Sequence, residues 1–212
     1  GSAERIKIPL VYTGYVTPRP VPGARAEERR RLGLTEGDRL VVVSAGGGKV
    51  GGPLMAAAAG AWKRLSRDPR LHMHLITGPY GDETGLKVTG GDRLTVERFS
   101  HRFLQLLAAA DLSVSMGGYN TTMNLLAAGV PRALIWPFGQ NREQGMRVER
   151  LQGRAPIHLL MDGELNGESL AGRITHLLDH PPGPAGAVRL DGAETSARWL
   201  SEWLEAEKEK DQ

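Results

Sequence analysis

Hydrophobic and polar positions along the chain follow two alternating periods, one typical of strands and one typical of helices. Short apolar runs predict strands at residues 7–13, 39–45, 71–77, 94–99, 112–116, 132–136 and 157–160. Between and after them, apolar positions at helical spacing predict helices at residues 24–32, 53–65, 102–110, 141–151, 168–178 and 195–208. One more helix should open near Asn120 and end by Gly129, with Pro131 beyond it.

The order of these elements predicts the fold class. Strands that alternate with helices favour a parallel sheet covered on both faces, which is a doubly wound, Rossmann-like α/β fold. In such sheets ligands bind beyond the carboxyl ends of the strands, at the point where the strand order reverses. Glycine-rich turns follow the strands that end near residues 45 and 116. We therefore expect these two turns to share one crevice.

Composition and charge narrow the class of protein. The 212 residues include 27 basic and 24 acidic ones, and the basic residues form no stripe with aromatic residues. A nucleic-acid partner is therefore not expected. No apolar run reaches the length of a transmembrane helix, and the absence of cysteine excludes disulfides and fits a reducing compartment. We expect a cytoplasmic protein with a cleavage scar at residues 1–3, one domain at 4–208 and a frayed tail at 209–212.

The first candidate site is the glycine-rich turn after the strand at 39–45. It fits the G-x-G-x-x-G pattern of nucleotide-binding turns with Gly46, Gly48 and Gly51, and Gly47 lies between the first two. A nicotinamide site also needs an acid at the end of the next strand, which instead ends Ile76-Thr77-Gly78. Two interpretations stay open. The turn contacts a phosphate, or it is tight enough that a side chain would clash.

A second turn follows the strand at 112–116. It joins a glycine pair to polar residues suited to opening a helix, namely Gly117, Gly118, Tyr119, Asn120 and Thr121. The N–H groups and dipole of a helix N-terminus favour phosphate, and the dipole contributes about 0.3–1 kcal/mol. The alternative is an ordinary helix start capped by Asn120 or Thr121. Asn124 lies one turn further on the same face, where an amide suits sugar hydroxyls.

A third candidate begins the helix at 141–151. Asn141 and Gln144 have the spacing of a capping box, which is a purely structural interpretation. The functional alternative is that Glu143 and Gln144 form hydrogen bonds to a polyhydroxylated ligand. The six histidines show no metal-ligand spacing, and no Ser/His/Asp set or Asp-x-Asp pair is present.

Taken in order, these motifs resemble one family. The turns at 46–48, 117–122 and 142–144, together with Phe99 and the Gly129-Val130-Pro131 segment, are similar to the C-terminal, donor-binding domain of GT-B glycosyltransferases. The match is to the family 28, MurG-like type and covers nearly the whole chain. It implies that a nucleotide sugar, usually linked to UDP, lies in a cleft facing a separate N-terminal acceptor domain.

The resemblance also implies roles for individual residues. The diphosphate would meet the backbone and side chains of Gly117, Gly118, Tyr119, Asn120 and Thr121, with Gly46, Gly47 and Gly48 closing over it. Phe99 and Ser100 would hold the base, and Glu143 and Gln144 would contact the donor sugar. Two positions depart from the pattern. Asn124 stands where the family commonly has a ribose-binding Glu, and Met116 stands where relatives often have a basic residue.

The function implied is transfer of a hexosyl group from the nucleotide sugar to an acceptor hydroxyl, without an obligatory metal. The general base would come from the N-terminal acceptor domain. The alternatives are a nucleotide-sugar hydrolase or epimerase, a nicotinamide-binding domain, and a non-catalytic nucleotide-binding scaffold. The last helix would pack on the absent domain or on its own sheet through Trp199, Leu200, Trp203 and Leu204.

Overall fold

The chain divides into two compact units. The computed structural model describes residues 6–81, 86, 91–139, 142–183 and 188–210. The larger unit is Pro18–Val188, and the smaller combines Gly1–Thr17 with Arg189–Gln212. The single domain expected at 4–208 stays a prediction. The expected scar at residues 1–3 lies outside the described residues.

The larger unit is built on a six-stranded parallel sheet with the order β3-β2-β1-β4-β5-β6. Its strands are β1 (Arg39–Ser44), β2 (Leu71–Ile76), β3 (Leu94–Glu97), β4 (Leu112–Met116), β5 (Ala133–Trp136) and β6 (Ile157–Leu159). This order is that of a doubly wound sheet, so the expected fold class is confirmed. The strand order reverses between β1 and β4, where Ser44 pairs with Ser115.

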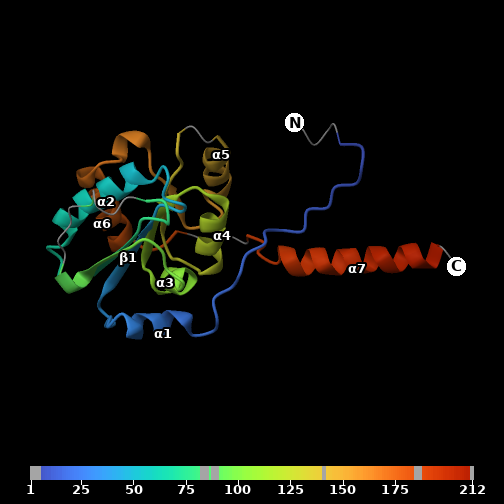
Figure 1. Cartoon of the computed structure of the whole chain (residues 1–212), viewed down its shortest axis with the longest axis horizontal. Coiled ribbons are helices and arrows are strands. Elements are labelled where there is room, and N and C mark those ends of the chain that lie inside the picture. Colours follow the sequence, from blue (N-terminus) through green and yellow to red (C-terminus); the bar gives the residue numbers. More distant parts are fainter. Residues whose placement is uncertain (1–5, 82–85, 87–90, 140–141, 184–187, 211–212) are drawn as a thin grey trace. The chain divides into compact units, whose positions relative to one another are not determined.

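Helices cover both faces of the sheet (Figure 1). One face carries α2 (Gly52–Leu65) and α6 (Gly167–Asp179), which pack on each other, and the other carries α1 (Ala24–Arg31) and α3 (Phe103–Ala109). The strands β4 and β5 are followed by α4 (Tyr119–Ala127) and α5 (Arg142–Leu151). Short 3₁₀ helices occupy Gly91–Arg93 and Asp162–Glu164.

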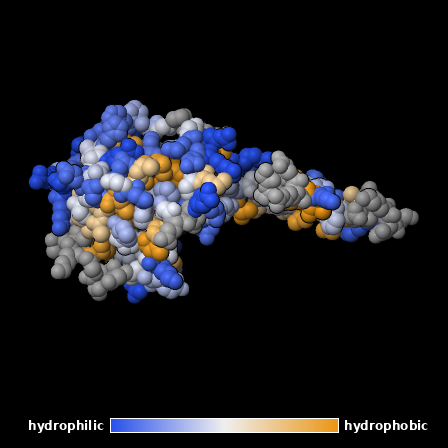
Figure 2. Space-filling model, turned by 90° about the horizontal axis from the view of Figure 1, so that it is seen from above, coloured by the Kyte–Doolittle hydropathy of each residue, from blue (hydrophilic) through white to orange (hydrophobic). Residues whose placement is uncertain are grey.

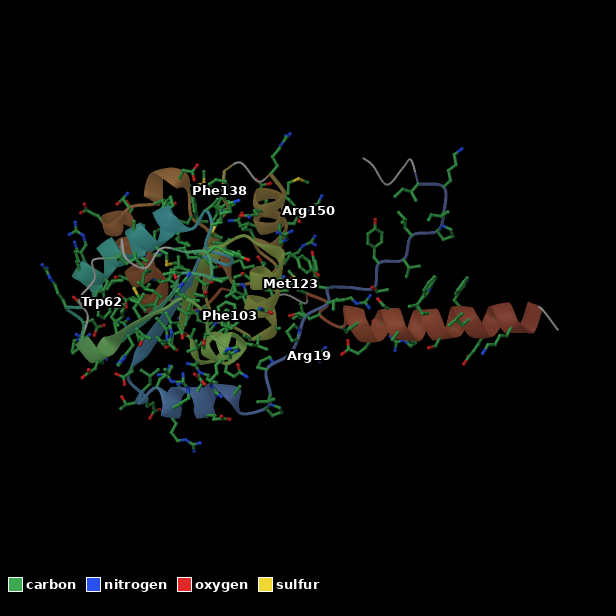
Figure 3. All side chains as sticks on the ribbon, viewed as in Figure 1. Arg19, Trp62, Phe103, Met123, Phe138 and Arg150 are labelled. Carbon is green, nitrogen blue, oxygen red and sulfur yellow. The ribbon has the colours of Figure 1, made fainter. Side chains whose placement is uncertain are left out.

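Burial of the sheet on both faces explains why the strands are continuous apolar runs in the sequence. Val41, Val42 and Val43 of β1 are fully buried, because helices lie on both sides of this strand. Trp62 of α2, which Figure 3 labels, is almost fully buried and belongs to the core cluster between the sheet and the α2–α6 layer. This packing fixes the carboxyl ends of the strands, where the site lies.

The strand expected at residues 7–13 is wrong. Residues 6–22 contain no helix or strand, and Ile8 and Tyr12 are exposed. The smaller unit instead joins this segment to the C-terminal part of the chain, since the N–H of Tyr15 donates to the carbonyl oxygen of Arg189 at 2.9 Å. An apolar run forms a strand only where a neighbouring strand offers a ladder, and no strand of the described residues pairs with this segment.

The smaller unit ends in the helix α7 (Gly192–Lys210). This helix extends two residues into the tail expected at 209–212, whose last two residues lie outside the described residues. Figure 2 shows hydrophobic side chains on the surface of this unit, and those of α7 are Trp199, Leu200, Trp203 and Leu204. What they pack on stays a prediction. No described helix is both long enough and apolar enough to cross a membrane.

Candidate functional site

A pocket of about 210 Å³ lies beyond the carboxyl ends of β1, β2 and β3 and against the start of α4. Six of the residues singled out from the sequence line it, namely Gly46, Phe99, Ser100, Asn120, Thr121 and Asn124. Six others were missed, namely Ser44, Ile76, Gly78, Pro79, Arg98 and Phe103. The turn after residue 45 and the first turn of α4 therefore share one crevice at the switch point, whereas Gly47, Gly48, Gly117, Gly118 and Tyr119 do not line it.

The glycines of the turn after β1 have different roles. Gly48 has a φ of +86°, and a Cβ there would lie 2.4 Å from the carbonyl oxygen of Thr77. At Gly51 a Cβ would lie 2.2 Å from that of Ala45. The steric interpretation of the turn therefore holds for Gly48 and Gly51, whereas Gly46 lines the pocket. The neighbouring Gly47 accepts a hydrogen bond from the N–H of Tyr80, which ties the loop after β2 to this turn.

The turn after β4 begins α4 in a way that the sequence did not predict. The N-cap is Gly118, and no side chain caps the helix, so the expectation that Asn120 or Thr121 caps it is wrong. Because the helix already begins at Tyr119, Asn120 and Thr121 lie in its first turn, and both line the pocket. The first N–H groups of a helix have no partner within it, so this end offers hydrogen-bond donors.

An aromatic wall closes the pocket on the β3 side. The side chain of Phe99 is 57% exposed, and its ring meets that of His101 edge to face at 4.9 Å between centroids. Phe103, labelled in Figure 3, lines the same pocket from the start of α3. Arg98 donates from Nη2 to the carbonyl oxygen of Pro79 at 2.7 Å, which links the loops after β2 and β3. An exposed aromatic ring in a pocket is suited to stacking on a planar base.

A buried carboxylate holds this wall in place. Glu28 of α1 is fully buried, and its carboxylate accepts hydrogen bonds from Arg31 at 2.7 Å and from Nε of Arg102 at 2.7 Å. Burial raises the pKa of Glu28, but the hydrogen bonds and charges of the two arginines outweigh it and lower the pKa below its ordinary value. Arg102 immediately precedes α3. The ion pair therefore anchors the loop that carries Phe99 and Ser100.

Ser44 contributes a buried polar atom to the floor of the pocket. The residue is 2% exposed, and among the described residues its Oγ has no hydrogen-bond partner. Buried hydroxyl groups normally have a partner. Ser44 lines the pocket, but its Oγ lies below the accessible surface, so we assign it no ligand contact. Ser44 was hard to predict as a pocket residue, because it ends a strand whose other residues are apolar and buried.

Glu143 and Gln144 do not line this pocket but adjoin the turn after β4. A Cβ at Gly117 would lie 3.0 Å from the Cβ of Gln144, so α5 packs closely on the turn. The Oε1 atom of Gln144 accepts a hydrogen bond from the N–H of Phe138, and Glu143 pairs with Arg147. Asn141, the expected partner in a capping box, lies outside the described residues. The structure thus places both residues beside the turn after β4 rather than in the pocket.

A second hollow of about 260 Å³ lies on the other side of the glycine turn. Its lining is mostly glycine and apolar, and includes Gly48, Gly52, Met55 and Leu86. A specific site for a polar ligand needs convergent polar groups. The pocket at the switch point has them and this hollow has few, so we take the pocket as the candidate site.

The histidines form no metal site within the part of the chain that the structure describes, where no group of three or more potential ligands occurs. His74 is buried and lies 2.7 Å from Oε1 of Glu97, a pairing that sequence spacing did not suggest. Burial lowers the pKa of His74, although the hydrogen bond to Glu97 acts in the opposite direction. We interpret this pair as part of the packing between β2 and β3.

The pocket, its glycine turns and the sheet order lie within the segment that matches a known family. The glycosyltransferase family 28 C-terminal domain matches residues 42–189. The chain belongs to this family. The resemblance inferred from the motifs is therefore confirmed, and with it the assignment to the glycosyltransferases.

Relatives and solved structures agree with this family 28 assignment. A UDP-N-acetylglucosamine--N-acetylmuramyl-(pentapeptide) pyrophosphoryl-undecaprenol N-acetylglucosamine transferase from Desulforudis audaxviator is 28% identical over 182 residues, 81% of this chain and 48% of that protein. The chain thus spans about half the length of this relative. MurG from Acinetobacter baumannii has a TM-score of 0.56 and 19% identity over 73% of this chain and 44% of its own. The calicheamicin glycosyltransferase CalG4 has a TM-score of 0.56 and 20% identity over 91% of this chain and 41% of its own. These two structures share the fold.

Two features of this family 28 domain stand out in the site. Asn124 lines the pocket one helical turn beyond Asn120, so a neutral amide occupies a wall where an acid would bind hydroxyls more strongly. Met116 is buried at the end of β4 and brings no charge to the glycine turn that follows. Any positive charge at this turn therefore comes from another element.

Proposed function

We propose that this chain is the donor-binding half of a glycosyltransferase that transfers a hexosyl group from a UDP-linked sugar to an acceptor hydroxyl. The observation that supports it most is the pocket at the switch point, which joins an exposed aromatic ring, a helix N-terminus and side-chain amides. These groups suit the base, the diphosphate and the sugar hydroxyls of one extended ligand. An N-terminal acceptor domain and a cytoplasmic location belong to the same proposal.

We assign residues around the pocket to each part of the donor. The base stacks on Phe99 beside Ser100, and the ribose hydroxyls bond to Asn124. The diphosphate meets the N–H groups that open α4 and the side chains of Asn120 and Thr121. Gly46 lies across from this helix, because a Cβ there would be 4.0 Å from Oγ1 of Thr121. The base, ribose and diphosphate would therefore occupy one continuous pocket.

The reaction proposed is displacement at C1 of the sugar. The acceptor oxygen forms a bond to C1, the bond from C1 to the diphosphate oxygen breaks, and a base of the acceptor domain takes the hydroxyl proton. Negative charge grows on the departing diphosphate, and the amide donors and dipole at the start of α4 stabilise it there. No obligatory metal is part of the proposal, since the sequence has no Asp-x-Asp pair.

Calorimetric titration of the chain with UDP, uridine and NADH tests the proposal. We expect saturable binding of UDP, weaker binding of uridine, and none of NADH. Tighter binding of NADH than of UDP would support the nicotinamide alternative, and absence of any binding would support a degenerate scaffold domain that has lost donor affinity. With the full-length protein, sugar transferred to the acceptor rather than to water or to a new epimer separates a transferase from a hydrolase or epimerase.

Asn124→Glu is expected to tighten UDP binding about fivefold. A carboxylate accepts stronger hydrogen bonds from ribose hydroxyls than an amide does, and the gain is of the order of 1 kcal/mol. Titration of the variant with UDP and with uridine should show the same gain for both, because the contact is to the ribose. The exposed Gln152, beyond the end of α5, provides a control in Gln152→Glu. No change or a loss in Asn124→Glu would contradict the ribose assignment.

A further inference from the structure

Arg147 of α5 contacts the turn after β4. Its Nη1 atom donates to the carbonyl oxygen of Gly117 at 2.7 Å, and its Nη2 atom pairs with the carboxylate of Glu143. The guanidinium carbon lies 5.4 Å from the centroid of the Tyr119 ring. The side chain is only 11% exposed. The guanidinium of Arg147 thus links the loop between β4 and α4 to Glu143 at the start of α5. The helix α5 lies next to α4 (Figure 1).

The contact with Gly117 fixes the orientation of a peptide group. In a trans peptide the carbonyl and the N–H of the next residue point in opposite directions. The N–H of Gly118 is therefore directed away from α5. A peptide between two glycines rotates easily, so a hydrogen bond from a cation is needed to hold one orientation. The same bond polarises the peptide, which makes the N–H of Gly118 a stronger donor.

Arg147 also brings a charged hydrogen-bond donor to a turn that has none of its own, and the carboxylate of Glu143 balances its charge. Met116 precedes the glycine pair, and no basic residue occurs among Gly117–Ala127 in the sequence. The guanidinium is largely shielded from water, so its field is screened less than that of a surface arginine. Glu143 is on the exposed side of this pair, with 75% of its side chain accessible. Arg147 therefore sets the position of both a backbone donor and a carboxylate.

We propose that Arg147 is the positioning residue for the donor's diphosphate. It orients the Gly118 N–H toward the ligand and holds Glu143 beside the turn for the sugar. The inference rests on the proposed function of the pocket and adds a residue from outside its lining. The nucleoside, which lies against Phe99 and Asn124 in that proposal, does not depend on Arg147.

Arg147→Met tests this dependence by keeping the length of the side chain and removing its charge and donors. We expect UDP to bind about tenfold more weakly to the variant, and uridine to bind within about twofold of wild type. Arg147→Lys keeps the charge but not the planar fork, and we expect a loss for UDP of about threefold. Arg150→Met removes an exposed charge from the same helix (Figure 3), and both affinities should stay unchanged.

Calorimetric titrations with UDP and uridine, with a thermal unfolding curve for each variant, give the result. Equal losses for UDP and uridine would mean that Arg147 only supports the fold, and would overturn the inference. Unchanged UDP binding in Arg147→Met would overturn it as well. If Arg147→Met unfolds, the losses of UDP affinity and of uridine affinity are compared in Arg147→Lys instead. Wild-type chain that binds uridine no worse than UDP would overturn the inference, while wild type that binds neither would overturn the proposed function first.

Discussion

Gly48→Ala is expected to lower the free energy of unfolding by about 3 kcal/mol or more. Gly48 has a φ of +86°, which a residue with a Cβ rarely adopts, at a cost of about 1–2 kcal/mol. The added Cβ would also lie 2.4 Å from the carbonyl oxygen of Thr77 and 2.6 Å from the backbone nitrogen of Gly81. Backbone atoms cannot move aside as a side chain can, and overpacking costs a further 1–3 kcal/mol, roughly. Urea denaturation at pH 7 measures the loss.

Gly47→Ala is the matched control from the same turn. Its φ is not in the left-handed region, and no atom lies within 4 Å of the Cβ that would be added. We expect its unfolding free energy to stay within about 0.5 kcal/mol of wild type. Equal stability of the two variants would show that the turn is looser than this packing implies, and would contradict the steric role of Gly48.

Glu28→Gln is expected to lower the free energy of unfolding by about 2 kcal/mol at neutral pH. The variant leaves a neutral amide where Arg31 and Arg102 both donate to a buried carboxylate, and hydrogen bonds to charged groups contribute about 1.5–3 kcal/mol. The arginines are partly exposed and regain some hydration, which limits the loss. Glu27→Gln, at the neighbouring and largely exposed acid, should cost less than about 0.5 kcal/mol.

The difference in the free energy of unfolding between wild type and Glu28→Gln should depend on pH. The folded-state pKa of Glu28 is lowered, so its contribution to stability is fully present above the unfolded-state pKa. That contribution is lost as the pH falls through the folded-state pKa, because the carboxyl group then takes up a proton. Urea denaturation at a series of pH values from 7 downward should therefore show the two curves converging in acid. A constant difference would contradict the ionised buried pair.

Much of the fold was predictable because its signals are local. Buried strands such as Leu112–Met116 are short apolar runs, and their helices follow from spacing and from glycine and proline at the ends. The strand expected at residues 7–13 was wrong for a different reason. Its apolar pattern is also local, but pairing requires a free edge beside it, and the sequence does not say where that edge lies.

The candidate site was predictable where it depends on turns. Gly46, Asn120 and Asn124 come from two motifs that the sheet order brings together. The residues that were missed act through long-range contacts. Glu28 and Arg102 are 74 positions apart, and His74 and Glu97 are 23 apart, so only the packing of α1 on α3 and the pairing of β2 with β3 join them. The helix cap was missed because a start at Tyr119 and one at Asn120 look alike in sequence.

We propose that one nucleoside diphosphate spans the turns after β1 and β4 and the loop after β3. Backbone amide NMR of the chain during titration with UDP reports on all three segments at once. We expect saturable shifts of the amide signals of Gly46, Ser100, Gly118 and Asn120, all with one dissociation constant. Shifts confined to Gly52 and Met55 in the second hollow, or no shifts at the turn after β4, would contradict it.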